Sequence, residues 1–321
     1  MRPLFSKIVG TCYYAVLGAL ALVTLAGCSA APPTVQEVQQ VPAVVLPSDQ
    51  QVSTTTPAPK RAALPSFNSI YVIVMENKEY GSVVGNPQLP YINSLIAQYG
   101  LATNYDAVTH PSQPNYLALL SGSTQGVTDD GVHEVSGPNL LDQIEASGRT
   151  WRVYEQNLPG GCFTGATASG GYARRHDPAM SFTQISGSPS RCANITALTN
   201  FDPNAANFEF IVPNTCNDMH NCGAPEGDRF LKSFVPGILA SRAWKQGGVL
   251  FIVWDEGTSN LGGGGHVPLL VISNQVAAGF KSALPHNHYS LVRTIEDAWG
   301  LGCLNHACTA NNLAEFFVNQ R

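Results

Sequence analysis

The sequence predicts an α/β fold, a three-layer sandwich with a mostly parallel central sheet. Apolar runs rich in β-branched residues alternate with segments of helical spacing along most of the chain. Such alternation is typical of parallel strands that are joined by helices. Polar and charged side chains directly follow several of the apolar runs, as expected where a ligand binds at the carboxyl ends of the strands.

Five apolar runs are expected to form the strands. The clearest is "GVLFIVWDE" at 248–256, and "NSIYVIVM" at 68–75 has the same continuous apolar character. Three shorter runs have a similar composition: "TWRVYE" at 150–155, "FEFIVPN" at 208–214 and "VPLLVIS" at 267–273. The absence of regular alternation indicates strands that are buried on both faces.

Helical spacing and end signals predict the helices between these strands. The expected helices span residues 91–100, 112–121, 139–147, 228–244 and 288–300. Glycine closes or directly follows four of the five, which is a common helix stop. By contrast, residues 160–203 are rich in Gly, Ser, Pro and Asn, and we expect them to form an insertion of irregular loops.

Composition limits the class of protein. The chain has 321 residues, of which 44% are hydrophobic and 12% charged, so it is long enough for one large domain, expected over residues 66–321. Its net charge is −5 and it has no block of basic residues. Binding to nucleic acid is therefore not expected.

The first 28 residues have the character of a signal peptide. Arg2 and Lys7 precede an apolar stretch at 13–25, and "LAGC" ends at Cys28. This ending resembles the bacterial lipobox, which implies cleavage before Cys28 and a lipid on its sulfur. An ordinary secretory signal is the alternative. Residues 29–65, rich in Pro and Thr, are expected to be a disordered tether.

The resulting prediction is an exported bacterial lipoprotein on the cell membrane or cell surface. Six cysteines remain after the signal, an even number that suits disulfides in an oxidising compartment. Proximity in sequence favours the pairs Cys162–Cys192, Cys216–Cys222 and Cys303–Cys308. A zinc–cysteine site is less favoured because no C-x-x-C pair is present.

Acidic and amide side chains follow two of the expected strands. Glu76 and Asn77 end one run, and Asp255 and Glu256 end another. Burying carboxylates without partners is costly, and hard divalent cations prefer oxygen ligands. These four residues are therefore predicted to bind one or two divalent metal ions. Solvated carboxylates at a sheet edge are the alternative.

Ser112 is the candidate nucleophile. It stands between two prolines in "THPSQPNYLALLSG", at the start of an expected helix, where backbone N–H groups favour an anion such as phosphate. A nearby metal would lower its pKa and bind its alkoxide, which makes Ser112 a further metal ligand. The side chains expected to hold phosphate or transfer protons are His110, Asp218, His220 and His266.

Seven motifs occur in order along the chain: "MENKEYG", "THPSQPNYLALLSG", "HDP", "NDMHNC", "VWDEG", "GGGGHVP" and "HNHYSL". Together they resemble the phosphoesterase family that contains acid phosphatases and phosphatidylcholine-type phospholipases C. The resemblance covers the whole domain and implies an alkaline-phosphatase-like fold. It also implies a phosphoserine intermediate at Ser112, with Glu76, Asn77, Asp255 and Glu256 as metal ligands. Within these motifs, Asn115, His176 and His288 are expected to contact the substrate.

Two departures from the family pattern favour a small acid phosphatase that acts on phosphomonoesters. Gly81 stands where the opening motif often has an aspartate, and the chain lacks the length for the C-terminal domains of such phospholipases C. A phosphodiesterase or phospholipase C is the first alternative, and a non-catalytic surface-binding lipoprotein is the second. A Ser-His-Asp esterase is disfavoured because no G-x-S-x-G surrounds any serine.

Overall fold

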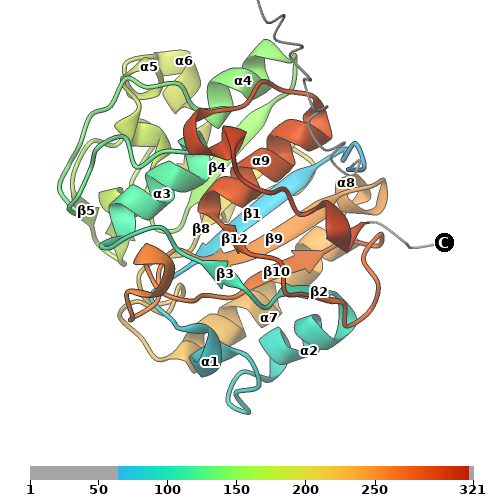
Figure 1. The fold of residues 1–321 in the computed structure, drawn as a ribbon. Helices are drawn as coiled ribbons and strands as arrows, with labels where there is room; N and C mark the ends of the chain where they lie inside the picture. Colours follow the sequence, from blue (N-terminus) through green and yellow to red (C-terminus); the bar gives the residue numbers. More distant parts are fainter. Residues whose placement is uncertain (1–63, 318–321) are drawn as a thin grey trace, which may run out of the picture. The chain divides into compact units, whose positions relative to one another are not determined.

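The computed structural model describes residues 64–317 (Figure 1). The predicted signal peptide, the lipidation site Cys28 and nearly all of the predicted tether lie outside these residues. Among the described helices, none combines the length and the apolar character that crossing a membrane requires.

An eight-stranded sheet runs through the centre of the domain (Figure 1). Its strands, in spatial order, are β11 (Lys281–Ser282), β2 (Gly100–Ala102), β10 (Leu269–Ile272), β9 (Val249–Trp254), β1 (Ile70–Met75), β8 (Phe208–Val212), β4 (Trp151–Glu155) and β7 (Ile195–Ala197). Only β10 runs antiparallel to its neighbours in this sheet. The prediction of a mostly parallel α/β sheet is therefore confirmed.

Helices cover both faces of the sheet, which explains why every residue of β1, β8 and β9 is buried. On one face, α3 (Ser112–Ser121) packs against α4 (Leu140–Ala146) and α9 (His288–Trp299), and on the other α2 (Pro90–Gln98) packs against α7 (Ala224–Ala240) (Figure 1). The short helices are α1 (Tyr80–Val83), α5 (Thr183–Ser186), α6 (Pro189–Cys192) and α8 (Arg242–Lys245).

Two small two-stranded sheets lie outside the central one. β3 (Tyr105–Asp106) pairs with β12 (His286–Asn287), so the chain that leads to α3 lies beside the start of α9. The other pair is β5 (Thr167–Ala168) with β6 (Tyr172–Ala173). These strands of two residues were not predicted, because so short a run has no hydrophobic pattern.

The helix expected at 228–244 is in fact two helices. α7 begins earlier, at Ala224, and ends at Ala240, and α8 follows after Ser241. Ser241 has an extended backbone, and its side chain accepts a hydrogen bond from the backbone N–H of Trp244. A serine that caps a new helix interrupts the apolar periodicity only slightly, so the sequence pattern predicts one continuous helix across Ser241.

The insertion at 160–203 is more regular than expected. It contains the β5–β6 hairpin, α5, α6 and β7, and β7 extends the central sheet by pairing in parallel with β4. Only three residues form β7, too few for a recognisable strand pattern. The expectation of purely irregular loops is therefore wrong here.

The helix that begins at Ser112 has the predicted limits, and all ten of its residues are buried. Gly122 ends it in the left-handed conformation, with φ of 66°, which glycine adopts without steric cost. Burial on all sides and a defined end fix the position of its first turn, and hence of Ser112.

All three predicted disulfides are present: Cys162–Cys192, Cys216–Cys222 and Cys303–Cys308. The first closes the insertion and the second closes the loop after β8. Such bonds indicate an oxidising environment for the folded protein.

Removing the longer crosslink should destabilise the protein more than removing a shorter one. The sequence separations are 30 for Cys162–Cys192 and 5 for Cys303–Cys308. Loop-closure entropy gives losses in unfolding free energy of about 4 and about 2 kcal/mol, respectively, for the paired Cys→Ser variants. Denaturant unfolding of both variants measures this order, and a larger loss for the shorter loop would contradict it.

Candidate active site

The acidic residues of the candidate site converge because their strands are neighbours. β9, β1 and β8 lie side by side in the same direction, and Asp255, Glu76 and Asp218 follow them. The backbone N–H groups of Asp255 and Glu76 continue the ladder, bonding to the carbonyls of Met75 and Asp218. The ends of three parallel strands thus bring together carboxylates that are far apart in sequence.

Ser112 lies directly over this edge as the first residue of α3. Its Oγ donates toward Glu256 Oε1 at 3.0 Å and Glu76 Oε2 at 3.2 Å. The side chain is almost fully buried. A helix N-terminus favours an anion, and in α3 the Gln113 N–H already donates to the Asp130 carboxylate at 3.0 Å.

Asn77 completes the group of predicted metal ligands. It has a positive φ of 40°, and its backbone N–H donates to Asp255 Oδ1 at 3.2 Å. Its side-chain amide donates to Glu256 Oε1 at 2.9 Å, so its Oδ1 is left without a hydrogen bond. The structure therefore brings Asn77 together with Glu76, Ser112, Asp255 and Glu256.

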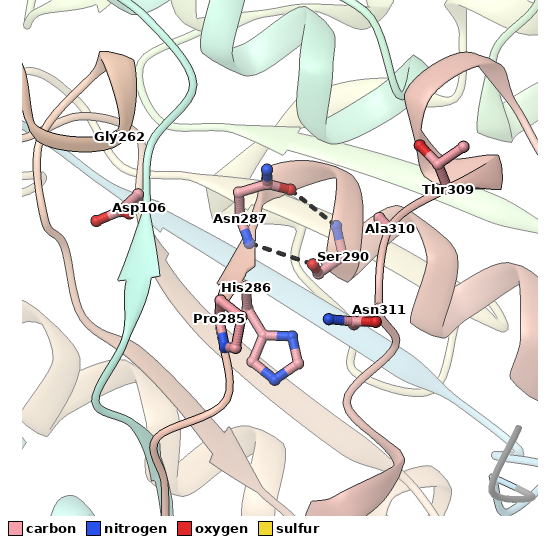
Figure 2. A pocket seen from close by; sticks show the side chains of 9 residues that line it. All are labelled: Asp106, Gly262, Pro285, His286, Asn287, Ser290, Thr309, Ala310 and Asn311. Atoms are coloured by element: carbon pink, nitrogen blue, oxygen red, sulfur yellow. Dashed lines mark hydrogen bonds between the residues drawn. The ribbon is translucent and has the colours of Figure 1, made fainter.

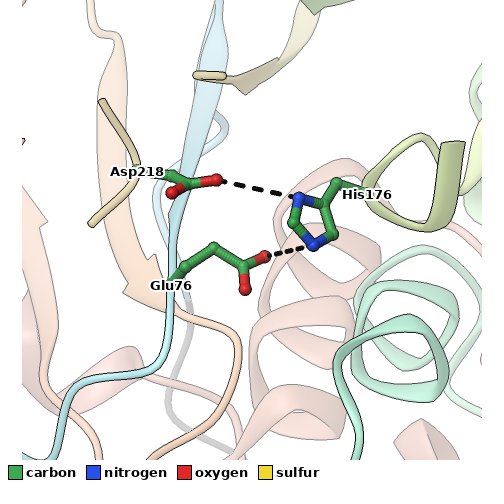
Figure 3. Close-up of side chains that lie close together, drawn as sticks. All are labelled: Glu76, His176 and Asp218. Atoms are coloured by element: carbon green, nitrogen blue, oxygen red, sulfur yellow. Dashed lines mark ion pairs between the residues drawn. The ribbon is translucent and has the colours of Figure 1, made fainter. Parts of the chain in front are cut away.

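A second group of donors shares Glu76 with the first (Figure 3). His176 lies between Glu76 and Asp218, with 3.2 Å from Nε2 to Glu76 Oε1 and 3.7 Å from Nδ1 to Asp218 Oδ2. One ligand atom of each residue lies within 4.8 Å of the others, and all three residues are buried. His176, expected to contact substrate, and Asp218, expected to be catalytic, are thus both placed as metal ligands would be.

Burial disfavours the charged forms of the acidic side chains and of His176. It raises the pKa of Glu76 and of Asp255 well above the usual range, and the neighbouring carboxylates Asp218 and Glu76, respectively, add to the effect. Burial also raises the pKa of Asp218 to about 8. It lowers the pKa of His176 well below its ordinary value, and Arg175 lowers it further. A cation among the carboxylates would favour their ionised forms.

The donor set fits one or two divalent cations. Four buried atoms of the site have no hydrogen-bond partner among residues 64–317: Asn77 Oδ1, His176 Nε2, Asp218 Oδ2 and Asp255 Oδ2. Unsatisfied oxygens of this kind are what a hard cation would bind, and the imidazole suits a transition metal. Ser112 and Glu256 are within reach of the same centre.

Two further histidines lie at the rim of this centre. His110 Nδ1 contacts Glu256 Oε2 at 2.5 Å, and its Nε2 contacts the Ser259 carbonyl at 2.8 Å. Partial burial lowers the His110 pKa, but these two partners outweigh burial and the net shift is upward. His220 Nε2 lies 3.4 Å from the Arg175 guanidinium, and both side chains are partly exposed.

Three predicted site residues have partners other than the side chains of the candidate metal ligands. Asn115 accepts from the N–H groups of Val108 and Thr109 and donates to the carbonyls of Thr109 and Pro111, so its amide is saturated. Asn115 therefore fixes the conformation of the loop before Ser112, and its expected contact with substrate stays a prediction.

The other two residues are histidines with structural partners. His288 is fully buried and contacts the Asp255 carbonyl at 2.6 Å and the Tyr105 hydroxyl at 3.0 Å, so it supports the backbone at the end of β9. His266 stacks on Tyr80 with 4.5 Å between ring centroids, and its Nε2 contacts the Thr103 carbonyl. Neither imidazole contacts Ser112 or the metal-site carboxylates.

Sequence reasoning missed three side chains of the site. The Tyr116 hydroxyl donates to Glu76 Oε1 at 2.5 Å, Arg175 adjoins His220, and the Lys78 ammonium donates to the Met219 and Asn77 carbonyls. Tyr116 could have been found, because it stands four residues after Ser112 and so on the same helix face.

A pocket of about 290 Å³ lies nearby, between the β3–β12 pair and the start of α9 (Figure 2). Its lining includes the Asp106 carboxylate, and Asn287 and Ser290 there already bond to each other as the cap of α9 (Figure 2). Neither Ser112 nor any of the metal-ligand candidates lines this pocket, so it is distinct from the candidate active site.

The raised pKa of Asp218 predicts how stability depends on pH. A carboxyl with a folded-state pKa of about 8 contributes stability below its ordinary pKa of 3.8, and this contribution is lost as pH rises to about 8. The metal-free protein should therefore melt at a lower temperature at pH 8 than at pH 5. A divalent cation should raise the melting temperature more at pH 8, since it binds the ionised carboxylate.

Melting curves with chelator and with Mn²⁺ or Zn²⁺ at both pH values measure this. The Asp218→Asn variant, which lacks this titrating group, should lose part of the pH dependence, and other buried carboxyls such as Glu76 and Asp255 account for the remainder. A metal-induced rise in melting temperature that is larger at pH 5 than at pH 8 would contradict the assignment.

Comparison with known proteins agrees with this arrangement. The Phosphoesterase family matches residues 85–302. A phosphatidylinositol-3-phosphatase of Mycobacterium tuberculosis is 30% identical over 262 residues, which are 80% of this chain and 85% of the relative. A probable acid phosphatase of Kluyveromyces lactis is 28% identical over 280 residues, which cover 79% of this chain and 63% of the yeast protein, less than two thirds of its length.

Among solved structures, a protein of the alkaline phosphatase superfamily from Vibrio parahaemolyticus has a similar fold. The TM-score is 0.52 at 13% identity, over 75% of this chain and 68% of the other. This likeness concerns the fold alone, and it agrees with the alkaline-phosphatase-like sandwich. The family match and the bacterial relative together establish that the chain belongs to the Phosphoesterase family and is a phosphoric ester hydrolase.

Proposed function

We propose that the protein is a metal-dependent phosphomonoesterase that forms a phosphoserine intermediate at Ser112. The observation that carries the proposal is the position of Ser112 Oγ, within 3.2 Å of both Glu76 and Glu256 at the first turn of α3. A hydroxyl that donates to two buried carboxylates has the surroundings of an activated nucleophile.

A divalent cation held by Asn77, Asp255 and Glu256, with Glu76 and Ser112 beside it, would lower the pKa of the serine hydroxyl and offset phosphate charge. Ser112 Oγ then forms a bond to phosphorus as the ester P–O bond breaks, and the leaving alcohol takes a proton. Water next attacks the phosphoserine, inorganic phosphate leaves, and Ser112 regains its hydroxyl proton.

Cationic side chains at the rim support a monoester as substrate. Arg175, Lys78 and protonated His110 lie around the carboxylate centre, and His220 adjoins Arg175. A dianionic monoester carries one more negative charge than a diester, so these cations stabilise the binding of a monoester more. The two curated relatives are both named phosphatases, which supports the same choice. A phosphodiesterase or phospholipase C would use the same nucleophile and remains the alternative.

We also propose that the enzyme is exported and attached to the membrane by a lipid on Cys28. The three disulfides support an oxidising compartment, and the "LAGC" motif supports lipidation.

Replacing the nucleophile should abolish turnover without unfolding the protein. Ser112→Ala removes one hydroxyl, so we expect a loss in kcat on the order of 10³-fold or more with little change in melting temperature. Phosphate release from p-nitrophenyl phosphate measures the loss. Near-normal turnover in the variant would rule out Ser112, whereas no turnover in the wild type with any divalent metal would rule out the function itself.

Activity should depend on a divalent metal that Asp255 helps to hold. Chelation should abolish phosphate release and added cation should restore it. Asp255→Asn, which has nearly the same shape, should lose metal and activity together. Metal analysis alongside the rate is the test, and full activity of metal-free protein would refute the assignment.

Phosphomonoesters should be hydrolysed faster than diesters, with an optimum below neutral pH. The upward-shifted pKa of His110 keeps this imidazole charged in mildly acidic solution, and the charge is lost as pH rises through that pKa. Rates for nitrophenyl phosphate, its diester analogue and phosphatidylcholine from acid to alkaline pH measure the preference. Faster cleavage of a diester at every pH would place the enzyme among the phosphodiesterases.

A further inference from the structure

A pocket of about 500 Å³ lies beyond the carboxyl ends of β4 and β7, separate from the carboxylate centre. Gln156 directly follows β4, Ala197 ends β7, and Phe234 of α7 forms a wall. Ligands of open α/β sheets bind along this same edge. The pocket therefore lies at the same end of the strands as the candidate active site.

The lining of this pocket is uncharged and amphipathic. Leu158, Leu198 and Phe234 give it apolar surface, while Gln156 and Ser169 supply hydrogen-bonding groups. None of the residues that line it is ionisable, so it is unsuited to hold a phosphate group. It is suited to an uncharged organic group with an apolar body.

The apolar wall is held in place by its own packing. Phe234 stacks on Phe230 with 5.3 Å between ring centroids and lies 4.6 Å from Phe201. A side chain fixed between two aromatic rings offers a ligand a surface that needs little ordering on binding.

Two segments join this pocket to the carboxylate centre. The Gln156 side-chain oxygen accepts hydrogen bonds from the Asn217 amide at 2.9 Å and from the Asn214 N–H at 3.0 Å, and Asn217 directly precedes Asp218. Ser169 belongs to the β5–β6 hairpin, whose second strand leads into the turn that carries His176. The pocket and the centre thus share the two segments that lie between them.

The separation fits a substrate that spans both places. β8 stands between β1 and β4, and adjacent strands lie about 4.8 Å apart, so the end of β4 is about 10 Å from the end of β1. From a phosphate at Ser112, an extended alcohol would have to cross the Asp218 loop to reach this pocket, which Phe234 of α7 lines on the face opposite α3.

We propose that this pocket binds the alcohol portion of the substrate and selects esters whose alcohol is extended, uncharged and largely apolar. The inference rests on the proposed phosphomonoesterase activity and specifies its substrate class. Small hydrophilic phosphates would bind only at the carboxylate centre, without the added affinity of the apolar wall.

Binding of non-hydrolysable phosphonates to the metal-loaded protein tests the proposal without relying on turnover. Biphenylmethylphosphonate should bind at least about tenfold more tightly than methylphosphonate, since burying a biphenyl group adds well over 1.4 kcal/mol. Thr199→Trp, an exposed position at the pocket, should block it and reduce this ratio to near one, while the affinity for methylphosphonate stays unchanged. Phe234→Ala should reduce the ratio by removing the apolar wall.

Leu284→Trp is the control, because it places the same side chain at an exposed position outside the pocket and should leave the ratio unchanged. Equal affinities of the two phosphonates for the wild type would overturn the inference. So would a ratio that both Thr199→Trp and Phe234→Ala leave intact. Failure of the proposed function would give a different result: the wild type would release no phosphate from any ester.

Discussion

The burial of Glu76, Asp218 and Asp255 at the ends of three adjacent strands is the constraint on which the candidate site depends. Because β9, β1 and β8 pair in parallel, these three carboxyls lie close together. Helices on both faces of the sheet exclude water from the strands. Uncompensated charge in such a place is strongly unfavourable. The carboxyls must then be protonated or share a cation, and their unpaired oxygens favour the cation.

The surroundings of this centre are rigid for reasons that can be followed in the chain. Ser112 begins a helix that is buried on all sides, and Asn115 fixes the preceding loop with four hydrogen bonds to its backbone. Tyr116, one turn after Ser112, orients Glu76, and the Cys216–Cys222 disulfide closes the loop that carries Asp218. Preorganisation of this kind lowers the cost of arranging charges during reaction.

Much of the fold was predictable from sequence, because long apolar runs and glycine stops are local signals. The strand at 248–256 and the helix at 112–121 are such cases. β7 was not predictable, because three residues are too few for a hydrophobic pattern. The break at Ser241 was not predictable either, because a capping serine scarcely disturbs the helical pattern. In the site, the metal-ligand candidates follow from strand order, whereas the place of His176 depends on tertiary folding of an insertion. The four hydrogen bonds from Asn115 to the loop before Ser112 were not predictable, because its motif does not reveal them.

The cation among the buried carboxylates is the central claim, and anomalous diffraction from crystals grown with Mn²⁺ at neutral pH tests it most directly. We predict a strong anomalous peak in contact with Asn77 Oδ1 and Asp255 Oδ2, the two atoms of the predicted metal ligands that lack a hydrogen bond, and next to Ser112 Oγ. A well-ordered protein with no anomalous peak at these atoms would contradict it.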